Sequence, residues 1–229
     1  MSYQDLSSRL GEIRERIAEH QRIGGWTHPV TIVAVTKGHP AEAVRAAARS
    51  GLTIVGENRV QEALAKQDLL ADLPVTWHLI GSLQRNKARQ AVGKFGLIHS
   101  VDRVELASEL ARRCPPGFRQ PILIQVNCSD ERQKGGVEVD GVRPLVDVVL
   151  AEPSLELRGL MTMAELTDDV ALQRRAFRRL REARASLDSA GIALAELSMG
   201  MSDDFPTAVE EGATMIRLGT VLFGPRPLR

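Results

Sequence analysis

The feature of this sequence that most constrains its fold is a regular alternation of short apolar runs with longer stretches of helical periodicity. The first run, at 30–35, is almost entirely β-branched (VTIVAV), which is typical of a strand buried on both faces. Seven further apolar runs follow, at 53–55, 75–80, 96–101, 121–126, 155–161, 192–197 and 213–218. Helical patterns lie between them, near 41–50, 58–70, 84–92, 103–113, 139–150, 168–189 and 204–211. Eight strands alternating with helices in 229 residues predict an α/β fold, a closed (β/α)8 TIM-type barrel rather than an open sheet.

The two ends of the chain modify this barrel. Residues 4–22 read as an extra N-terminal amphipathic helix, with Leu6, Leu10, Ile13 and Ile17 at helical spacing. Only eleven residues follow Leu218, so we expect the eighth helix to be short or missing and the N-terminal helix to cover that part of the barrel. No linker or low-complexity segment interrupts the pattern, which predicts a single domain over 1–229.

Composition excludes several classes of protein. A net charge of +1 indicates neither binding to a nucleic acid nor binding to a membrane surface. The two cysteines, Cys114 and Cys128, belong to no CxxC or Cys/His spacing, which argues against a disulfide scaffold or a zinc knuckle. The first twenty residues contain four acids and no apolar core of a signal peptide. We therefore expect a cytoplasmic protein with reduced thiols.

Polar residues at the ends of the strands mark the candidate site, because the chemistry of such barrels sits on the loops after the strands. Lys37 directly follows the first strand, which places its amine at the barrel mouth. Partial burial there would lower the pKa of the amine and favour a nucleophile. The plain alternative is a lysine whose stem lies along the rim with its charge in water.

The loops after the last two strands supply a candidate anion site. The segment SMGMS at 198–202 and the pair Gly219 and Thr220 offer hydroxyls and backbone N–H groups, although the same residue types also make ordinary turns. Barrel closure brings the first strand beside the last, so Lys37 and the Gly219 loop become neighbours. An amine next to a phosphate site fits a small phosphorylated aldehyde such as pyridoxal 5'-phosphate (PLP).

Arg217 is the third element, because it interrupts the apolar run ATMI-R-L at 213–218. A buried guanidinium needs a partner. Two partners are open on chemistry alone: the pyridine nitrogen of PLP, or a structural ion pair with Glu57 or another acid in the barrel.

Linked motifs across nearly the whole chain resemble the YggS/PROSC family of PLP homeostasis proteins. They are IVAVTK at 32–37, GEN at 56–58, VQE at 60–62, WHLIG at 77–81, LQ at 83–84, IHSVD at 98–102, QVN at 125–127, RGLM at 158–161, LSMGMS at 197–202 and IRLGT at 216–220. The resemblance implies the barrel of the alanine racemase N-terminal domain, with PLP held as a Schiff base, an internal aldimine, on Lys37.

The resemblance also implies roles for other residues and for the protein. Arg217 would face the pyridine nitrogen. The remaining implied cofactor contacts are Asn58 and His78 along the ring, Met201 in the loop after the seventh predicted strand, and Ser198, Gly219 and Thr220 at the phosphate. The family implies a monomer that holds PLP without catalysis for vitamin B6 and amino-acid homeostasis, with PLP-dependent apo-enzymes as possible recipients. One departure is Arg59, where many members have tyrosine.

A racemase-like enzyme with weak activity is the alternative function. Racemisation needs acid/base groups on both faces of the cofactor, and in alanine racemase a tyrosine from a second domain serves the face opposite the lysine. The only tyrosine here is Tyr3, near the start of the chain. The residues therefore favour a carrier over an enzyme.

Two further hypotheses come from charge and ligand patterns. Arginines at 174, 175, 178, 179, 181 and 184 form a basic run that could bind an acidic partner or RNA, or could simply be the solvated face of a barrel helix. His78 and His99 follow neighbouring strands and could converge on a metal, but no third ligand stands at a sensible spacing.

Overall fold

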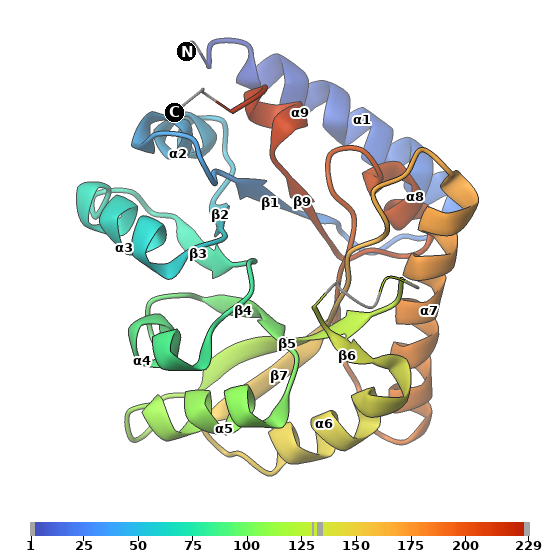
Figure 1. Cartoon of the computed structure of the whole chain (residues 1–229). Coiled ribbons are helices and arrows are strands. Elements are labelled where there is room, and N and C mark those ends of the chain that lie inside the picture. The colour runs from blue at the N-terminus through green and yellow to red at the C-terminus, as the bar shows by residue number, and fades with distance from the viewer. Residues whose placement is uncertain (1–2, 130, 132–134, 227–229) are drawn as a thin grey trace.

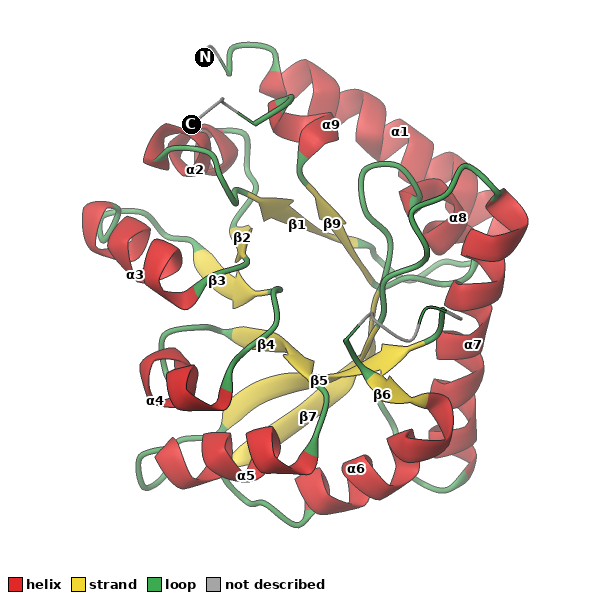
Figure 2. Ribbon diagram, viewed as in Figure 1, coloured by secondary structure: helices red, strands yellow, loops and turns green. Residues whose placement is uncertain are grey.

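A computed structural model describes residues 3–129, 131 and 135–226 of the chain. Within these residues, eight parallel strands close into a barrel in the order β4-β3-β2-β1-β9-β8-β7-β5, and the pairing of β4 with β5 completes the ring. Figure 2 shows the helices around this ring of strands. The predicted (β/α)8 TIM-type barrel is confirmed. Its strands are β1 (Thr31–Val35), β2 (Ile54–Glu57), β3 (Thr76–Leu79), β4 (Leu97–Val101), β5 (Gln120–Asn127), β7 (Leu155–Met161), β8 (Glu196–Ser198) and β9 (Met215–Leu218).

The helices fall where the periodicity predicts them. In chain order they are α1 (Leu6–Gly24), α2 (Ala41–Arg49), α3 (Val60–Leu69), α4 (Ala88–Ala91), α5 (Val104–Arg113), α6 (Val142–Leu150), α7 (Val170–Ser189), α8 (Phe205–Glu210) and α9 (Thr220–Phe223). Single 3-10 turns, η1 (Arg85–Lys87) and η2 (Val139–Gly141), precede α4 and α6.

Two details differ from the sequence expectation. A short strand, β6 (Val137–Glu138), pairs parallel with the end of β5 outside the closed ring. Two residues carry no periodicity, so no pattern could have predicted this strand. The apolar run at 192–197 contributes only its end to β8, because residues 192–195 belong to the loop between α7 and β8.

The N-terminal helix covers the side of the barrel where the last helix is short, as predicted. Helix α9 has four residues, and α1 lies across α8 and α9 in Figure 1. The apolar face of α1 buries Leu6, Leu10, Ile13 and Ile17. Arg9 fixes the contact by donating from Nη1 to the Leu222 carbonyl at 2.7 Å.

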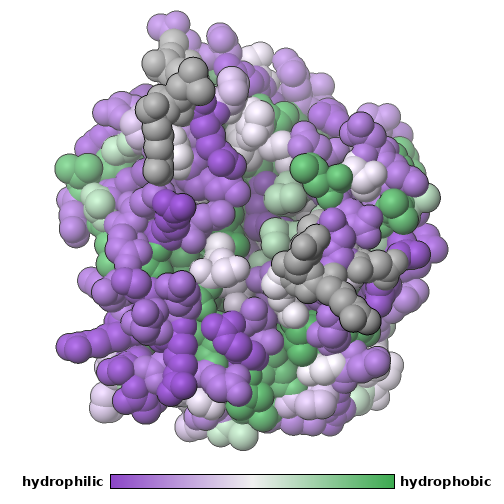
Figure 3. All heavy atoms as spheres, in the orientation of Figure 1, coloured by the Kyte–Doolittle hydropathy of each residue, from purple (hydrophilic) through white to green (hydrophobic). Residues whose placement is uncertain are grey.

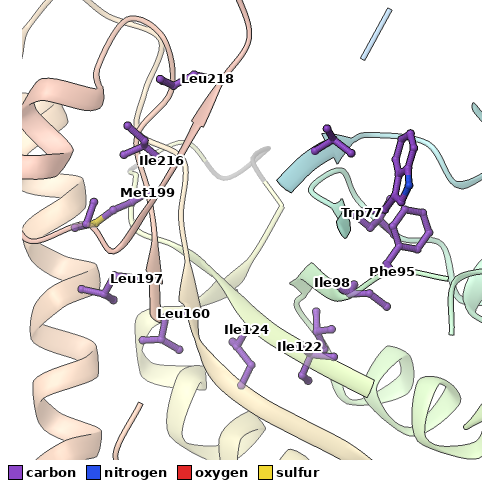
Figure 4. Packing of buried hydrophobic residues seen from close by; sticks show 14 of the residues in the cluster. Trp77, Phe95, Ile98, Ile122, Ile124, Leu160, Leu197, Met199, Ile216 and Leu218 are labelled. Carbon is purple, nitrogen blue, oxygen red and sulfur yellow. The ribbon is translucent and has the colours of Figure 1, made fainter. Parts of the chain in front are cut away.

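The apolar residues form two cores, one on each side of the strands. The outer core lies between the strands and the helices, and Figure 4 shows Leu197 and Met199 within it on the side of α7. The inner core fills the lower part of the barrel with Val33, Leu97, Leu123, Met161 and Met215. Side chains on a strand point the same way every second residue.

This period of two places polar side chains directly above the inner core. His99, Gln125 and Arg217 stand two residues beyond Leu97, Leu123 and Met215 on their strands, so they point into the barrel nearer its carboxyl end. The barrel is thus apolar at its base and polar beneath its mouth. Among the described helices, none is long and apolar enough to cross a membrane.

Candidate functional site

The carboxyl ends of the strands surround a cavity of about 380 Å³. This size lies in the range of pockets that hold small ligands. Its walls come from the ends of β1, β2, β3, β5, β7, β8 and β9, so residues far apart in sequence meet there. The lining residues are Val35, Lys37, His39, Asn58, Ile80, Gly81, Ser82, Gln125, Met163, Met201, Ser202, Asp203, Arg217, Gly219, Thr220 and Arg226.

Lys37 enters this cavity two residues beyond the last residue of β1. Its side chain is half-buried, and burial lowers the pKa of its amine, with help from the positive charges of Arg226 and Arg217. Within the described residues, no hydrogen bond or ion pair engages Nζ. An amine with a lowered pKa and no partner is available as a nucleophile.

Arg217 lies on β9, the strand that pairs with β1, with only 4% of its surface exposed. Its Nη1 donates to the Ser198 carbonyl at 2.8 Å and to Ser198 Oγ at 2.7 Å, and its Nη2 donates to the Thr162 carbonyl at 2.8 Å. Burial lowers the pKa of the guanidinium to about 10, so it stays charged at neutral pH. These bonds leave Nε without a described partner in a side chain that lines the cavity.

The alternative of an ion pair between Arg217 and Glu57 is wrong. Glu57 Oε1 instead accepts from Lys66 Nζ at 2.5 Å and from the Thr36 hydroxyl at 2.7 Å. Glu57 stands at the end of β2, where its side chain meets α3 rather than the barrel interior. Arg217 therefore faces the cavity with neutral hydrogen-bond partners behind it.

A buried chain of hydrogen bonds continues from Arg217 across the barrel. His99 Nδ1 lies 3.0 Å from Ser198 Oγ, and His99 Nε2 lies 3.0 Å from His78 Nδ1. Arginine only donates, so Ser198 Oγ accepts from Arg217, and its hydroxyl proton is satisfied by donating to His99 Nδ1. His99 then carries its proton on Nε2 and donates to His78 Nδ1. Burial lowers the pKa of His78 to about 4 and lowers the pKa of His99 well below its ordinary value, which keeps both rings neutral.

Backbone N–H groups converge on one hydroxyl at the other wall of the cavity. Gly219 N and Val221 N donate to Ser202 Oγ at 3.2 and 3.3 Å. Asp204 Oδ1 accepts from Met201 N, so this carboxylate caps its own turn and does not face the N–H groups. We call Ser202, Thr220 and the two N–H groups the anion cradle, because their N–H and O–H donors could hold an anion there.

Close backbone packing holds Asn58 at the cavity. Gly81 lies two residues beyond Leu79, the last residue of β3. A Cβ on Gly81 would lie 2.3 Å from the Asn58 carbonyl oxygen. Only glycine permits this approach. The GEN motif at 56–58 and the WHLIG motif at 77–81 are thus linked through one contact.

Six of the eight cofactor-binding candidates line the cavity: Lys37, Asn58, Met201, Arg217, Gly219 and Thr220. Ser198 and His78 do not line it, and their contacts with phosphate and ring stay predictions. Ser198 is the last residue of β8 and points into the barrel below the mouth, where Arg217 and His99 occupy its hydroxyl. His78 is buried behind His99 on β3.

Sequence reasoning did not assign His39 or Arg226 to the cavity, and within the SMGMS segment it named Ser198 rather than Ser202 as the phosphate contact. Ser202 is the last residue of the SMGMS segment predicted as an anion site, and it lines the cavity, whereas Ser198 does not. His39 stands two residues after Lys37. Arg226 lies near the chain end, and no local pattern connects it with the first strand.

Several other candidates have structural roles. In the basic run on α7, Arg174, Arg178 and Arg181 pair with Glu210 or Glu211, which favours a structural role for these three. Arg59 is exposed and pairs with Glu62 instead of entering the cavity. Within the described residues, His78 and His99 belong to no group of three or more possible metal ligands.

The donors at the cavity fit PLP. An unengaged amine suits the aldehyde, the cradle of Ser202, Gly219, Thr220 and Val221 N suits the phosphate, and Arg217 suits the pyridine nitrogen. Three cations, Lys37, Arg217 and Arg226, against the single carboxylate of Asp203 give the lining a positive charge, which favours an anionic ligand.

Comparison with known proteins finds relatives in the family that the sequence motifs resemble. Residues 9–227 match the family described as "Alanine racemase, N-terminal domain". Three relatives named "Pyridoxal phosphate homeostasis protein" are 43% identical in Pseudomonas aeruginosa, 42% in Aquifex aeolicus and 36% in Escherichia coli K12. These alignments cover 95–97% of this chain and 96–97% of the relatives.

Solved structures share the whole fold. PipY of Synechococcus elongatus, 41% identical, superposes with a TM-score of 0.84 with PLP bound and 0.85 without PLP, covering 96% of this chain and 100% of PipY. Alanine racemase of Clostridium difficile 630 is 14% identical with a TM-score of 0.73, covering 96% of this chain and 58% of the racemase. The racemase likeness concerns the fold alone.

Proposed function

The chain belongs to the pyridoxal phosphate homeostasis family, whose barrel is that of the alanine racemase N-terminal domain, and we propose from this premise that it binds PLP covalently through Lys37. The observation that carries the proposal is one cavity that unites an unengaged, low-pKa amine with an anion cradle and a buried guanidinium. PLP, when bound, supplies an electrophilic aldehyde and a conjugated ring that accepts electrons.

Each residue of the cavity has a definite task in this proposal. Lys37 would attach the aldehyde, and the cradle of Ser202, Gly219 and Thr220 would hold the phosphate. Arg217 would donate to the pyridine nitrogen. Because a guanidinium with a pKa of about 10 keeps its proton at neutral pH, it would leave that nitrogen unprotonated. Asn58 and Met201 would contact the ring.

We propose that the protein is a PLP carrier or regulator rather than an enzyme. A guanidinium at the nitrogen makes the ring a weaker electron sink, which disfavours carbanion chemistry. Tyr3 does not line the cavity, because its ring packs edge-on against Phe223 at 5.9 Å and His39 at 6.4 Å. His39 is the titratable ring that does line it, so a slow racemase-like activity is the alternative function.

The remaining properties are proposed on the same basis. The protein would be a cytoplasmic monomer with one domain over residues 1–229, and PLP-dependent apo-enzymes would be its recipients. The support is the near full-length match to PLP homeostasis relatives.

Borohydride trapping tests the central proposal. Incubation of the purified protein with PLP should give a yellow protein, and reduction should fix the label on the peptide that contains Lys37. Lys37→Ala should lose both colour and label. Label retained elsewhere in that variant would overturn the assignment. Racemisation of alanine well above the Lys37→Ala background would instead favour the enzyme.

A further inference from the structure

A second cavity lies outside the barrel, between the turn that precedes α4 and the outer face of α5. Its volume is about 610 Å³, and we call it the arginine groove. Figure 3 shows hydrophilic side chains gathered over α4 and α5 in this region. The groove is lined by Gln84, Arg85, Asn86, Arg103, Glu109, Arg112 and Arg113.

The charge of this part of the chain is unusual. Residues 84–119 contain eight lysines and arginines against three acids, a net charge of +5, while the whole chain carries +1 and the remainder therefore −4. The arginines of α7 offer a contrast, because Glu210 and Glu211 pair with Arg174, Arg178 and Arg181. The groove is lined by four guanidinium groups and one carboxylate, although Arg103 among them pairs with Asp102 just outside the lining.

That carboxylate organises the groove. Glu109 has a side chain that is 8% exposed, and it accepts from Arg112 at 2.7 Å and from Arg113 Nε at 2.7 Å, while Arg85 approaches to 3.8 Å. These hydrogen bonds lower the pKa of Glu109 to about 2, so the carboxylate stays charged. Arg112 donates to this carboxylate from Nε and Nη2, and Arg113 donates from Nε, so that within the described residues Arg112 Nη1 and the Nη groups of Arg113 are not engaged.

The lining decides which kind of anion would fit. It consists of four arginines, two amides and one carboxylate, without an apolar or aromatic side chain. Single-stranded nucleic acids bind on aromatic platforms, and protein partners anchor through apolar or aromatic hot spots. Guanidinium forks and amides match the oxygens of phosphoryl and carboxylate groups.

We propose that the arginine groove binds a compact polyanion, a small molecule with two or more phosphoryl or carboxylate groups, at a site separate from the barrel mouth. Glu109 positions Arg112 and Arg113, and the anion contacts Arg112 Nη1 and the Nη groups of Arg113 together with Arg85. This site stands on different residues from the PLP proposal and does not depend on it.

Calorimetric titration with two probes, inorganic pyrophosphate and citrate, tests this site. The protein is first loaded with PLP and reduced, so that the mouth is closed to a second anion, and the unloaded protein is titrated in parallel. We expect saturable binding to both forms, weakened by salt. The Nε–H resonances of Arg85, Arg112 and Arg113 should shift in nitrogen-15 spectra. Whichever probe binds more tightly identifies the phosphoryl or the carboxylate class.

Variants locate the binding. The double variant Arg112→Gln with Arg113→Gln should bind at least about tenfold more weakly, because two charge-assisted contacts are lost. Arg85→Gln removes a side chain that is 65% exposed and only 3.8 Å from Glu109, so it tests the site with little risk to folding. Arg143→Gln on α6, whose arginine pairs with Asp147, is the matched control and should bind as the unaltered protein does.

Three results would overturn the proposal. The first is no saturable binding of either probe to the loaded protein. The second is unchanged affinity in both the double variant and Arg85→Gln. The third is an equal loss in Arg143→Gln, which would indicate a general charge effect. If PLP labelling fails, titration of the unloaded protein and of the same variants still tests anion binding in the groove.

Discussion

Two serines four positions apart, near the barrel mouth, have different hydrogen-bond partners. Ser198 ends β8 inside the barrel and supports Arg217, whereas Ser202 reaches the backbone N–H groups of Gly219 and Val221. The same hydroxyl group therefore serves the buried cation in one place and the anion cradle in the other. Their removal should have different consequences.

Ser202→Ala should weaken PLP retention by about tenfold, with the free energy of unfolding changed by less than about 0.5 kcal/mol, because a half-exposed cradle loses one donor. Ser198→Ala should instead lower that free energy by about 1–3 kcal/mol, since a fully buried site loses the acceptor for Arg217 and the donor to His99. Absorbance after dialysis measures retention, and urea titration measures stability.

Ser189→Ala, on the exposed end of α7, is the control for both serines and should change neither quantity. Equal retention in Ser202→Ala and the unaltered protein would place the phosphate elsewhere. Unaltered stability of Ser198→Ala would mean that the hydrogen-bond chain behind Arg217 contributes little.

At the scale of elements, α1 replaces the outer layer that a short α9 cannot provide. Its buried leucines and isoleucines pack on α8 and α9, and Arg9 reaches the Leu222 carbonyl. Trp26 continues this attachment by donating from Nε1 to the Glu210 carbonyl at 2.7 Å. The helix thus covers the region that carries the end of the anion cradle, so its packing should matter for the stability of the whole barrel.

Leu10→Ala should lower the free energy of unfolding by about 2–5 kcal/mol, because a side chain that is 2% exposed leaves a cavity under α1. The matched variant Leu69→Ala removes a leucine that is 68% exposed at the end of α3 and should cost less than about 0.5 kcal/mol. Urea denaturation followed by circular dichroism compares the two. Similar losses in both would contradict the covering role of α1.

At the scale of the whole molecule, the barrel buries two neutral histidines under its mouth. Unfolding returns His78 and His99 to water, where a histidine titrates near its ordinary pKa of about 6.5. Because the folded pKa of His78 is lowered to about 4, the unfolded chain binds a proton there that the folded chain does not. Stability is therefore full above the unfolded pKa and is lost as the pH falls from about 6.5 toward 4.

His78 alone should lower the free energy of unfolding by about 2 kcal/mol between pH 6.5 and 5. His78→Gln should have a shallower loss over this window than the unaltered protein, although its stability at pH 7 is also lower. Urea titrations at several pH values measure the slopes, and parallel slopes in His78→Gln would contradict the argument.

The sequence by itself determined the barrel and predicted that Lys37 and Arg217 lie at its mouth. Periods of two and 3.6 residues are local properties, so strands and helices could be assigned from neighbouring residues. Lys37 and Arg217 were found because each breaks or ends an apolar run. Closure of the barrel then predicted that they lie near the Gly219 loop, and β1 does pair with β9 in register, Val33 beside Arg217.

Only the tertiary structure decided which side chains reach the cavity. Whether Ser198 or Ser202 clears the strand end depends on where β8 stops, and a shift of one residue turns a side chain to the other face. Arg226 lines the same cavity as Lys37, and Glu109 gathers three arginines, through an arrangement that no local period encodes. Such contacts depend on the packing of the whole barrel, in which many weak interactions fix the position of each side chain together.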